Sequence, residues 1–254
     1  MHHRVRVEQE SSGRSHRTSR SRRARRAEPA SARLLRGNAL DVLRSLPTAS
    51  IDAIVTDAPY GIGYRSTRGE RILGDRSPEI WWMGEAFRVL RRRSPVVCFC
   101  RWDVSETFRT ALEAAGFRIR CPLVWNKARG SIGDCRRTLA PAHEIAWIAT
   151  KGDWRLPGRR IPDVLTYPRV PPSRRCHPTE KPVGLLREIL ACVTREGDLV
   201  LDPFAGSGST GEASIREGRR FLGVELDPRH AATARRRLGS ARRAVSGFSP
   251  DDSA

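Results

Sequence analysis

The sequence predicts an α/β protein with a doubly wound, mostly parallel sheet. Apolar runs of strand length alternate with stretches of helical periodicity, which is the pattern of successive βαβ units. A glycine-rich turn, Gly206 to Gly208, also follows one apolar run, and Glu225 ends the next run about 20 residues later. At 254 residues the chain is long enough for one such domain with a sizeable core.

The first half of the chain supplies most of the expected elements. Leu40, Leu43 and Leu46 recur at helical spacing after a turn, and the apolar run that follows them ends in Asp57. A later helix has Asp103 as its expected N-cap and Gly116 as its closing residue. The expected helices are 37–47, 77–90 and 103–117, and the expected strands are 50–57, 94–100, 118–125 and 143–150.

The second half begins after a segment rich in proline and arginine. Residues 152–176 lack any period and predict an irregular surface insertion. A helix is expected at 181–194, then a strand ending at Asp202, the glycine-rich turn and a helix, then a strand ending at Glu225 and a last helix. The expected boundaries are therefore a disordered basic arm at 1–33, a domain at 34–240 divided into 34–151, 152–176 and 177–240, and a disordered tail at 241–254.

Charge and cysteine usage narrow the class of protein. The formal net charge of +19 favours a polyanionic partner, although all but three of the 47 basic residues are arginines, a skew that a GC-rich genome also produces. The six cysteines form no C-x-x-C pair, and Cys98 and Cys100 would share one face of a strand as reduced thiols. A zinc site from His143, Cys176 and His177 fits no common ligand spacing, so no metal is expected.

No apolar run reaches the ~18 residues of a membrane span, and the charged N-terminus has no apolar segment behind it as a secretory signal would. We therefore expect a cytoplasmic protein without a membrane partner.

The glycine-rich turn indicates a nucleoside cofactor. Glycines let the backbone turn tightly against a ligand, and the amides at the start of the next helix then face that ligand. The turn lacks the G-K-[ST] ending of a phosphate-binding loop and is not a full G-x-G-x-x-G. Glu225 stands where an acid accepts hydrogen bonds from both ribose hydroxyls, or else it only ends a strand in a solvated loop.

Three motifs together resemble those of the DNA amino-methyltransferases. "DPFAGSGST" at 202–210 resembles the S-adenosylmethionine loop of that family, and "TDAPYG" at 56–61 is similar to its catalytic tetrapeptide, usually Asp-Pro-Pro-Tyr. "HPTEKP" at 177–182 resembles the segment that precedes the cofactor loop. The order, catalytic motif first, resembles the permuted group called beta, over Leu34 to Leu238.

The resemblance implies a Rossmann-like methyltransferase fold and assigns roles to residues. Asp57 and the main-chain carbonyl of Ala58 would accept hydrogen bonds from an exocyclic amine, and Pro59 and Tyr60 would complete the catalytic turn, with Tyr60 stacking on a base flipped from the duplex. S-adenosyl-L-methionine would be the cofactor. The residues implied to contact it are Asn38, Asp41, Thr179, Lys181, Asp202, Phe204, Gly206, Gly208 and Glu225.

At two positions this sequence departs from the family pattern in ways that could reduce catalytic activity. Ala58 replaces the first proline, and Asn38 stands where the family usually has an acid that is thought to contact the cofactor's adenine, with Asp41 as a substitute. A catalytically impaired nucleic-acid-binding relative therefore stays as an alternative.

The resemblance implies a site-specific DNA methyltransferase with double-stranded DNA as partner. Asp57 favours N6 of adenine as the target, because serine is more usual at this position in N4-cytosine enzymes, which remain the alternative. Arginines of the insertion are the candidates for phosphate or base contacts. A homodimer and a cognate restriction endonuclease are left open, since restriction-modification systems and solitary enzymes both fit.

Overall fold

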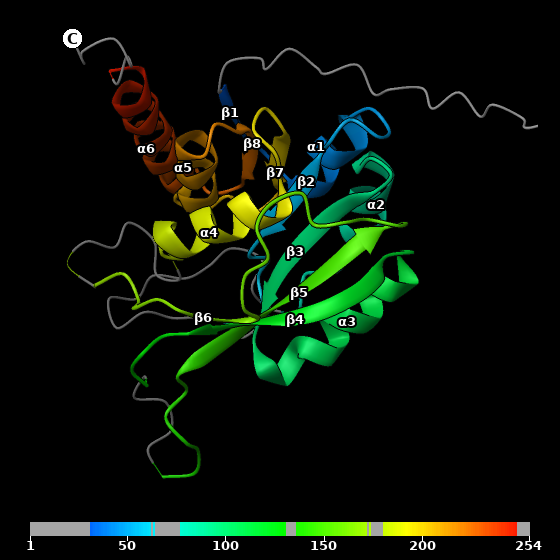
Figure 1. Cartoon of the computed structure of the whole chain (residues 1–254), viewed down its shortest axis with the longest axis vertical. Helices are drawn as coiled ribbons and strands as arrows, with labels where there is room; N and C mark the ends of the chain where they lie inside the picture. The colour runs from blue at the N-terminus through cyan, green and yellow to red at the C-terminus, as the bar shows by residue number, and fades with distance from the viewer. Residues whose placement is uncertain are drawn as a thin grey trace, which may run out of the picture.

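The fold was analysed in a computed structural model that describes residues 31–61, 63, 77–130, 136–171, 173 and 180–247. In these residues eight strands form one sheet of order β1-β8-β7-β2-β3-β5-β4-β6 (Figure 1). The strands are β1 (Ala32–Arg36), β2 (Ala53–Thr56), β3 (Ser94–Cys100), β4 (Arg118–Asn126), β5 (His143–Lys151), β6 (Val164–Thr166), β7 (Leu199–Asp202) and β8 (Arg220–Glu225).

The sheet is mostly parallel, as the sequence predicted. Strands β1, β8, β7, β2 and β3 run parallel to one another. Strand β5 is antiparallel to both β3 and β4, and β6 is parallel to β4. Strands β2 and β7 are neighbours although about 150 residues separate them, since Ala53 pairs with Val200 and Ile54 with Leu201. Their carboxyl ends therefore lie at the same edge of the sheet.

Helices cover both faces of the sheet, which makes it doubly wound (Figure 1). The helices α1 (Ala39–Ser45), α2 (Met83–Val89) and α3 (Ser105–Ala114) lie on one face, and α4 (Val183–Val193), α5 (Ser209–Arg216) and α6 (Pro228–Ser246) lie on the other. Two apolar clusters fill these layers, one under α1–α3 and one under α4–α6. Strands β2 and β3 are buried at every position, as expected for central strands covered on both faces.

Some boundaries differ from the prediction. Strand β1 begins at Ala32, inside the segment assigned to the basic arm, because its backbone pairs with β8 along the edge of the sheet. Helix α6 continues to Ser246, past the expected domain end at 240, because Ala241 packs into the core. A short 3-10 helix, Trp102–Val104, precedes α3, and Asp103 pairs with Arg101 and caps no helix.

The predicted insertion is not wholly irregular. Strand β6 lies within it and adds to the sheet beside β4. The predicted shared face of Cys98 and Cys100 on β3 is confirmed, as both thiols are buried in the same cluster. Among the described residues, no helix is long and apolar enough to cross a bilayer.

One buried hydrogen bond ties the ends of β2 and β7 together. Thr56, the last residue of β2, donates its hydroxyl to Oδ1 of Asp202, the last residue of β7, at 2.7 Å. Both side chains are almost fully buried, and Asp202 Oδ1 also accepts from the Phe204 amide at 3.1 Å. Burial raises the pKa of Asp202 to about 6, so the carboxylate depends on these donors for its charge near neutral pH.

Thr56→Val should therefore lower the free energy of unfolding by about 1.5–3 kcal/mol, the typical loss for a hydrogen bond to a charged group. Valine keeps the shape of threonine and leaves one lone pair of the buried carboxylate unpartnered. Urea denaturation at pH 8 measures the change, and Thr56→Ser, which keeps the hydroxyl, is the control. A Val variant as stable as the wild type would show that this bond contributes nothing.

Candidate active site

The turn after β2 presents Asp57 at the edge of the sheet. Gly61 ends this turn with φ +78°, and a Cβ on it would lie 2.3 Å from the carbonyl carbon of Ser77. The Pro59 carbonyl accepts a hydrogen bond from the Glu79 amide at 3.0 Å, which fixes the turn from outside. Ala58 is buried, and its carbonyl accepts no backbone hydrogen bond from the described part of the chain. With respect to the described residues, that carbonyl can still accept a hydrogen bond from a ligand.

Asp57 lies in a compact cluster of charged groups. Its carboxylate forms an ion pair with the Lys181 ammonium and accepts a hydrogen bond from the Tyr60 hydroxyl. The same ammonium lies 3.0 Å from Glu144 Oε2, and the Lys127 ammonium lies 2.7 Å from Glu144 Oε1. Lys181 is only 4% exposed, and its charge faces the rings of Phe99, Tyr60 and Trp125 at 5.1, 5.8 and 5.9 Å.

Burial acts on each of these charges differently. Burial raises the pKa of Asp57 above its ordinary range, against the opposing effect of the Lys181 ammonium. Burial also disfavours the charged form of Lys181, but the two carboxylates outweigh it and raise the pKa of this lysine. Burial would raise the pKa of Glu144 as well, yet two ammonium groups hold it below its ordinary value. Glu144 is therefore the better compensated carboxylate of the two.

The glycine-rich turn after β7 approaches the same edge of the sheet. Gly206 and Gly208 have φ of +52° and +82°, values in the left-handed region that glycine adopts without strain. Helix α5 begins directly after Gly208, so its first amides face the space above the turn. The ring of Phe204 packs edge-on against Trp81 and Trp82 at centroid distances of 6.2 and 5.8 Å, which joins the two halves of the domain.

Glu225, at the end of β8, holds the turn and keeps free capacity as an acceptor. Its Oε2 accepts from the Gly206 amide and its Oε1 from the Asp227 amide, both at 2.8 Å. A carboxylate offers about four lone pairs, so each oxygen can accept one more hydrogen bond. Burial raises the pKa of Glu225 to about 7, and nearby Asp202 adds to this effect. These acceptors fit the two hydroxyls of a ribose.

The Asn38 loop lies beside Glu225. The Gly37 amide donates to the Glu225 carbonyl at 3.0 Å, which follows from the pairing of β1 with β8. The Asn38 side chain accepts from the Leu40 amide at 2.8 Å and so caps α1, while Asp41 is exposed in the first turn of that helix.

The segment before α4 connects the two turns. Glu180 pairs with Arg237 at 2.6 Å and lies 3.4 Å from the hydroxyl of Ser207 in the glycine-rich turn. The next residue, Lys181, contacts Asp57 in the other turn. Thr179, Cys176 and His177 lie outside the described residues.

Sequence reasoning singled out neither Glu144 nor Lys127 as a functional residue. Glu144 sits near the start of β5 and Lys127 directly after β4, where the antiparallel pairing of these strands brings them together. The sequence does show a lysine after one apolar run and an acid at the start of another. It does not show that β5 runs antiparallel to β4, which is what brings the two side chains together.

The geometry is that of a ligand site shared by two strand ends, and comparison with known proteins identifies its family. A family model described as DNA methylase (N6_N4_Mtase) matches residues 157–236. The chain is 36% identical over 226 residues to "Putative methylase YubD" of Escherichia coli (strain K12). The match covers 87% of this chain and 96% of YubD. The chain belongs to the N6/N4 DNA methylase family.

Further relatives agree with this family. The methylase is 28% identical over 240 residues to the type II methyltransferase M2.DpnII of Streptococcus pneumoniae, covering 81% of this chain and 88% of the relative. The crystal structure of TTHA0409 from Thermus thermophilus in complex with S-adenosyl-L-methionine matches with a TM-score of 0.63 at 26% identity, over 84% of this chain and 96% of that one.

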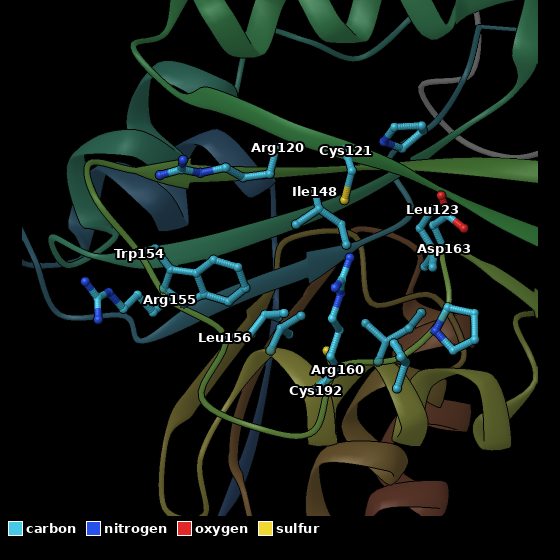
Figure 2. A pocket seen from close by; sticks show the side chains of 15 residues that line it. Arg120, Cys121, Leu123, Ile148, Trp154, Arg155, Leu156, Arg160, Asp163 and Cys192 are labelled. Carbon is cyan, nitrogen blue, oxygen red and sulfur yellow. The ribbon is translucent and has the colours of Figure 1, made fainter.

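The described part of the methylase's insertion divides into two regions. Residues 152–163 run over the sheet face that carries α4 and border a cavity of about 880 Å³, lined by Trp154, Arg155, Arg160 and side chains of β4, β5 and α4 (Figure 2). On β4, Cys121 pairs with Ile148 beside this cavity, and Trp125 pairs with Glu144. Cys121 and Trp125 are four residues, or ~13 Å, apart along the strand. Beyond β6, Arg169 donates to the Gly130 carbonyl at 3.3 Å.

Gly208→Ala should weaken the methylase's fold at the glycine-rich turn. The left-handed φ costs an L-residue about 1–2 kcal/mol, and the added Cβ would lie 3.0 Å from Ala234 Cβ. Gly84→Ala in α2 is the matched control, because nothing lies within 4 Å of its added Cβ, and alanine should stabilise this helix by about 0.5–1 kcal/mol. Chemical denaturation compares them. Equal effects of the two substitutions would contradict the strain assigned to Gly208.

Proposed function

We propose that this methylase transfers a methyl group from S-adenosyl-L-methionine to N6 of adenine in double-stranded DNA. The observation that carries the proposal is the adjacency of β2 and β7, joined by the Thr56–Asp202 hydrogen bond. Asp57 and the glycine-rich turn follow these two strands directly. A base amine held by the first turn would thus face a cofactor held by the second.

The residues of the catalytic turn suit an amine that must become nucleophilic. The lone pair of an exocyclic base amine is delocalised into the ring, and two acceptors on its N–H groups favour a tetrahedral nitrogen. Asp57 would supply a carboxylate oxygen and Ala58 its main-chain carbonyl. Holding both acceptors in place before the reaction lowers the barrier by positioning and electrostatic preorganisation. Tyr60 would release Asp57 and stack on the flipped base.

The cofactor side is proposed to hold a nucleoside through Glu225 and the amides of the turn. Glu225 would accept from the ribose hydroxyls, and Asn38 would lie close to the adenine through the contact of Gly37 with Glu225. When bound, S-adenosyl-L-methionine supplies an electrophilic methyl group on its sulfonium. The Phe204 ring, held by the two tryptophans, would border the same space.

Asp57 supports adenine as the target over cytosine, because an aspartate opens the tetrapeptide more often in N6-adenine enzymes of this family. Target recognition is proposed for the loop after β4 and for the insertion beyond β6, since Arg169 of the insertion donates to Gly130 of that loop, at the sheet edge where Asp57 lies. Arg155 and Arg160, by contrast, line the cavity on the sheet face.

Transfer of labelled methyl groups tests the proposal. The protein is incubated with labelled S-adenosyl-L-methionine and unmethylated DNA, and the DNA is digested to nucleosides. We expect N6-methyladenosine as the labelled product. Labelled N4-methylcytosine would assign the protein to the other base, and no labelled nucleoside would support the impaired relative.

Asp57→Ala should abolish this transfer, because the amine then loses its carboxylate acceptor, while cofactor affinity changes less than about threefold. Asp153→Ala, an exposed aspartate just after β5, is the matched control and should transfer methyl groups as the wild type does. Equal loss of transfer and cofactor binding in Asp57→Ala would remove the role given to this residue.

Cofactor affinity should rise with pH through neutrality. The pKa of Glu225 is about 7 without ligand, and donors from a ribose favour the ionised form, so binding releases a proton. Between pH 6 and pH 8 the ionised fraction, and with it the affinity, should increase about tenfold. Isothermal titration calorimetry measures this slope. Glu225→Gln should bind the cofactor more weakly, and its affinity should not depend on pH in this range. If Glu225→Gln keeps the same pH dependence as the wild type, Glu225 is not the group that causes it.

A further inference from the structure

Four charged side chains from four separate segments meet at the catalytic turn. Asp57 follows β2, Lys127 follows β4, Glu144 lies near the start of β5, and Lys181 precedes α4. They form an alternating row in which Lys127 pairs with Glu144, Glu144 with Lys181, and Lys181 with Asp57. Two positive and two negative charges balance, which is how buried charges are tolerated.

The row distributes its positive charge unevenly between the two carboxylates. Among the described residues, Glu144 has an ammonium on each oxygen, whereas Asp57 pairs with Lys181 alone and shares it with Glu144. The Lys181 ammonium contacts both Asp57 and Glu144, and the lysine side chain is only 4% exposed. The ammonium therefore has little freedom to move. The position of Lys181 is therefore set from both sides.

We infer that Glu144 is a positioning residue for methyl transfer, which acts on Asp57 by holding the Lys181 ammonium. Glu144 fixes where the ammonium lies and competes with Asp57 for its charge. The ammonium in turn keeps Asp57 ionised, as an acceptor for the amine must be. The inference deepens the proposed function and rests on it for the activity measurement only.

The direction of each effect follows from the groups that face Asp57. Burial raises the pKa of Asp57, Lys181 lowers it and Glu144 raises it. Tyr60 donates to Asp57, while the thiols of Cys98 and Cys100 and the carboxyl of Asp202 lie within electrostatic range. Burial keeps Tyr60 and both thiols neutral by raising each pKa, so the charged groups that act on Asp57 in the described surroundings are Lys181, Glu144 and Asp202, and only Lys181 and Glu144 belong to the row of ion pairs.

Replacing the two partners of this pair should consequently move the acidic limb of activity in opposite directions. Glu144→Gln removes the competing charge, so Asp57 ionises at lower pH and the limb moves to lower pH. Lys181→Met removes the compensating ammonium, so the limb moves to higher pH. A limb displaced by one pH unit corresponds to an about tenfold change in the ionised fraction of Asp57 at any pH below the limb. If Glu144 only supported the fold, Glu144→Gln would not move the acidic limb in the direction opposite to Lys181→Met.

The activity measurement is a pH profile of kcat for methyl transfer at saturating cofactor and DNA. Glu106→Gln is the matched control, because its partner Arg109 lies on the same exposed face of α3, and its limb should coincide with that of the wild type. Displacements of the same sign in Glu144→Gln and Lys181→Met would overturn the inference. An unmoved limb in folded Glu144→Gln would overturn it as well.

A second measurement does not depend on turnover. Lys127, Lys151 and Lys181 are the only lysines of the chain, so 13C labelling at Cε gives few signals, which single Lys→Met variants assign. We expect Lys181 to titrate above an ordinary lysine in the wild type and at lower pH in Glu144→Gln. A Lys181 titration unchanged by Glu144→Gln would overturn the inference. A protein that shows the change but transfers no methyl group would refute the proposed function and leave this charge coupling standing.

Discussion

The parallel pairing of β2 with β7 is the constraint on which the site depends. These strands come from opposite ends of the domain's sequence, yet their neighbouring carboxyl ends carry the two turns that matter. The Thr56–Asp202 hydrogen bond closes the junction, and Phe204 packs across it against Trp81 and Trp82. Polar residues at the carboxyl ends of adjacent parallel strands are a general place for ligands in open α/β sheets.

The segment before α4 adds a second link between the halves. Glu180 contacts the glycine-rich turn and Lys181 the catalytic turn, so adjacent residues connect the two sides of the site. The row of charges that includes Lys181 is costly to bury, and its alternation of sign is the arrangement that offsets this cost. Such preorganised charges can act on a reaction without reorganising during it.

Much of the fold was predictable because local patterns agree with it. The apolar runs of β2, β3 and β7, the glycines after β7 and the acid at the end of β8 each have one simple structural explanation. β1 was missed because its two arginines, Arg33 and Arg36, resemble those of the basic arm, and only its pairing with β8 makes it a strand. The length of α6 likewise depends on Ala241 packing against distant core residues.

The candidate site was predictable only where its residues belong to short motifs. Asp57 and Glu225 could be found because each stands at a strand end beside a turn signal. Glu144 could not, because its contact with Lys181 depends on β5 running antiparallel between β3 and β4, a long-range register that no local pattern encodes. The resemblance implied that Lys181 contacts the cofactor. In the structure its ammonium pairs with Asp57, and the contact with the cofactor stays a prediction.

A crystal structure with DNA and a non-reactive analogue of S-adenosyl-L-methionine would show whether the two turns hold a base and the cofactor face to face. We expect a flipped base whose amine lies within hydrogen-bond distance of an Asp57 carboxylate oxygen and the Ala58 carbonyl. On its other side the analogue should contact Glu225 and the glycine-rich turn. A base that binds away from Asp57, or an analogue seated at another edge of the sheet, would show that the two turns do not form one active site.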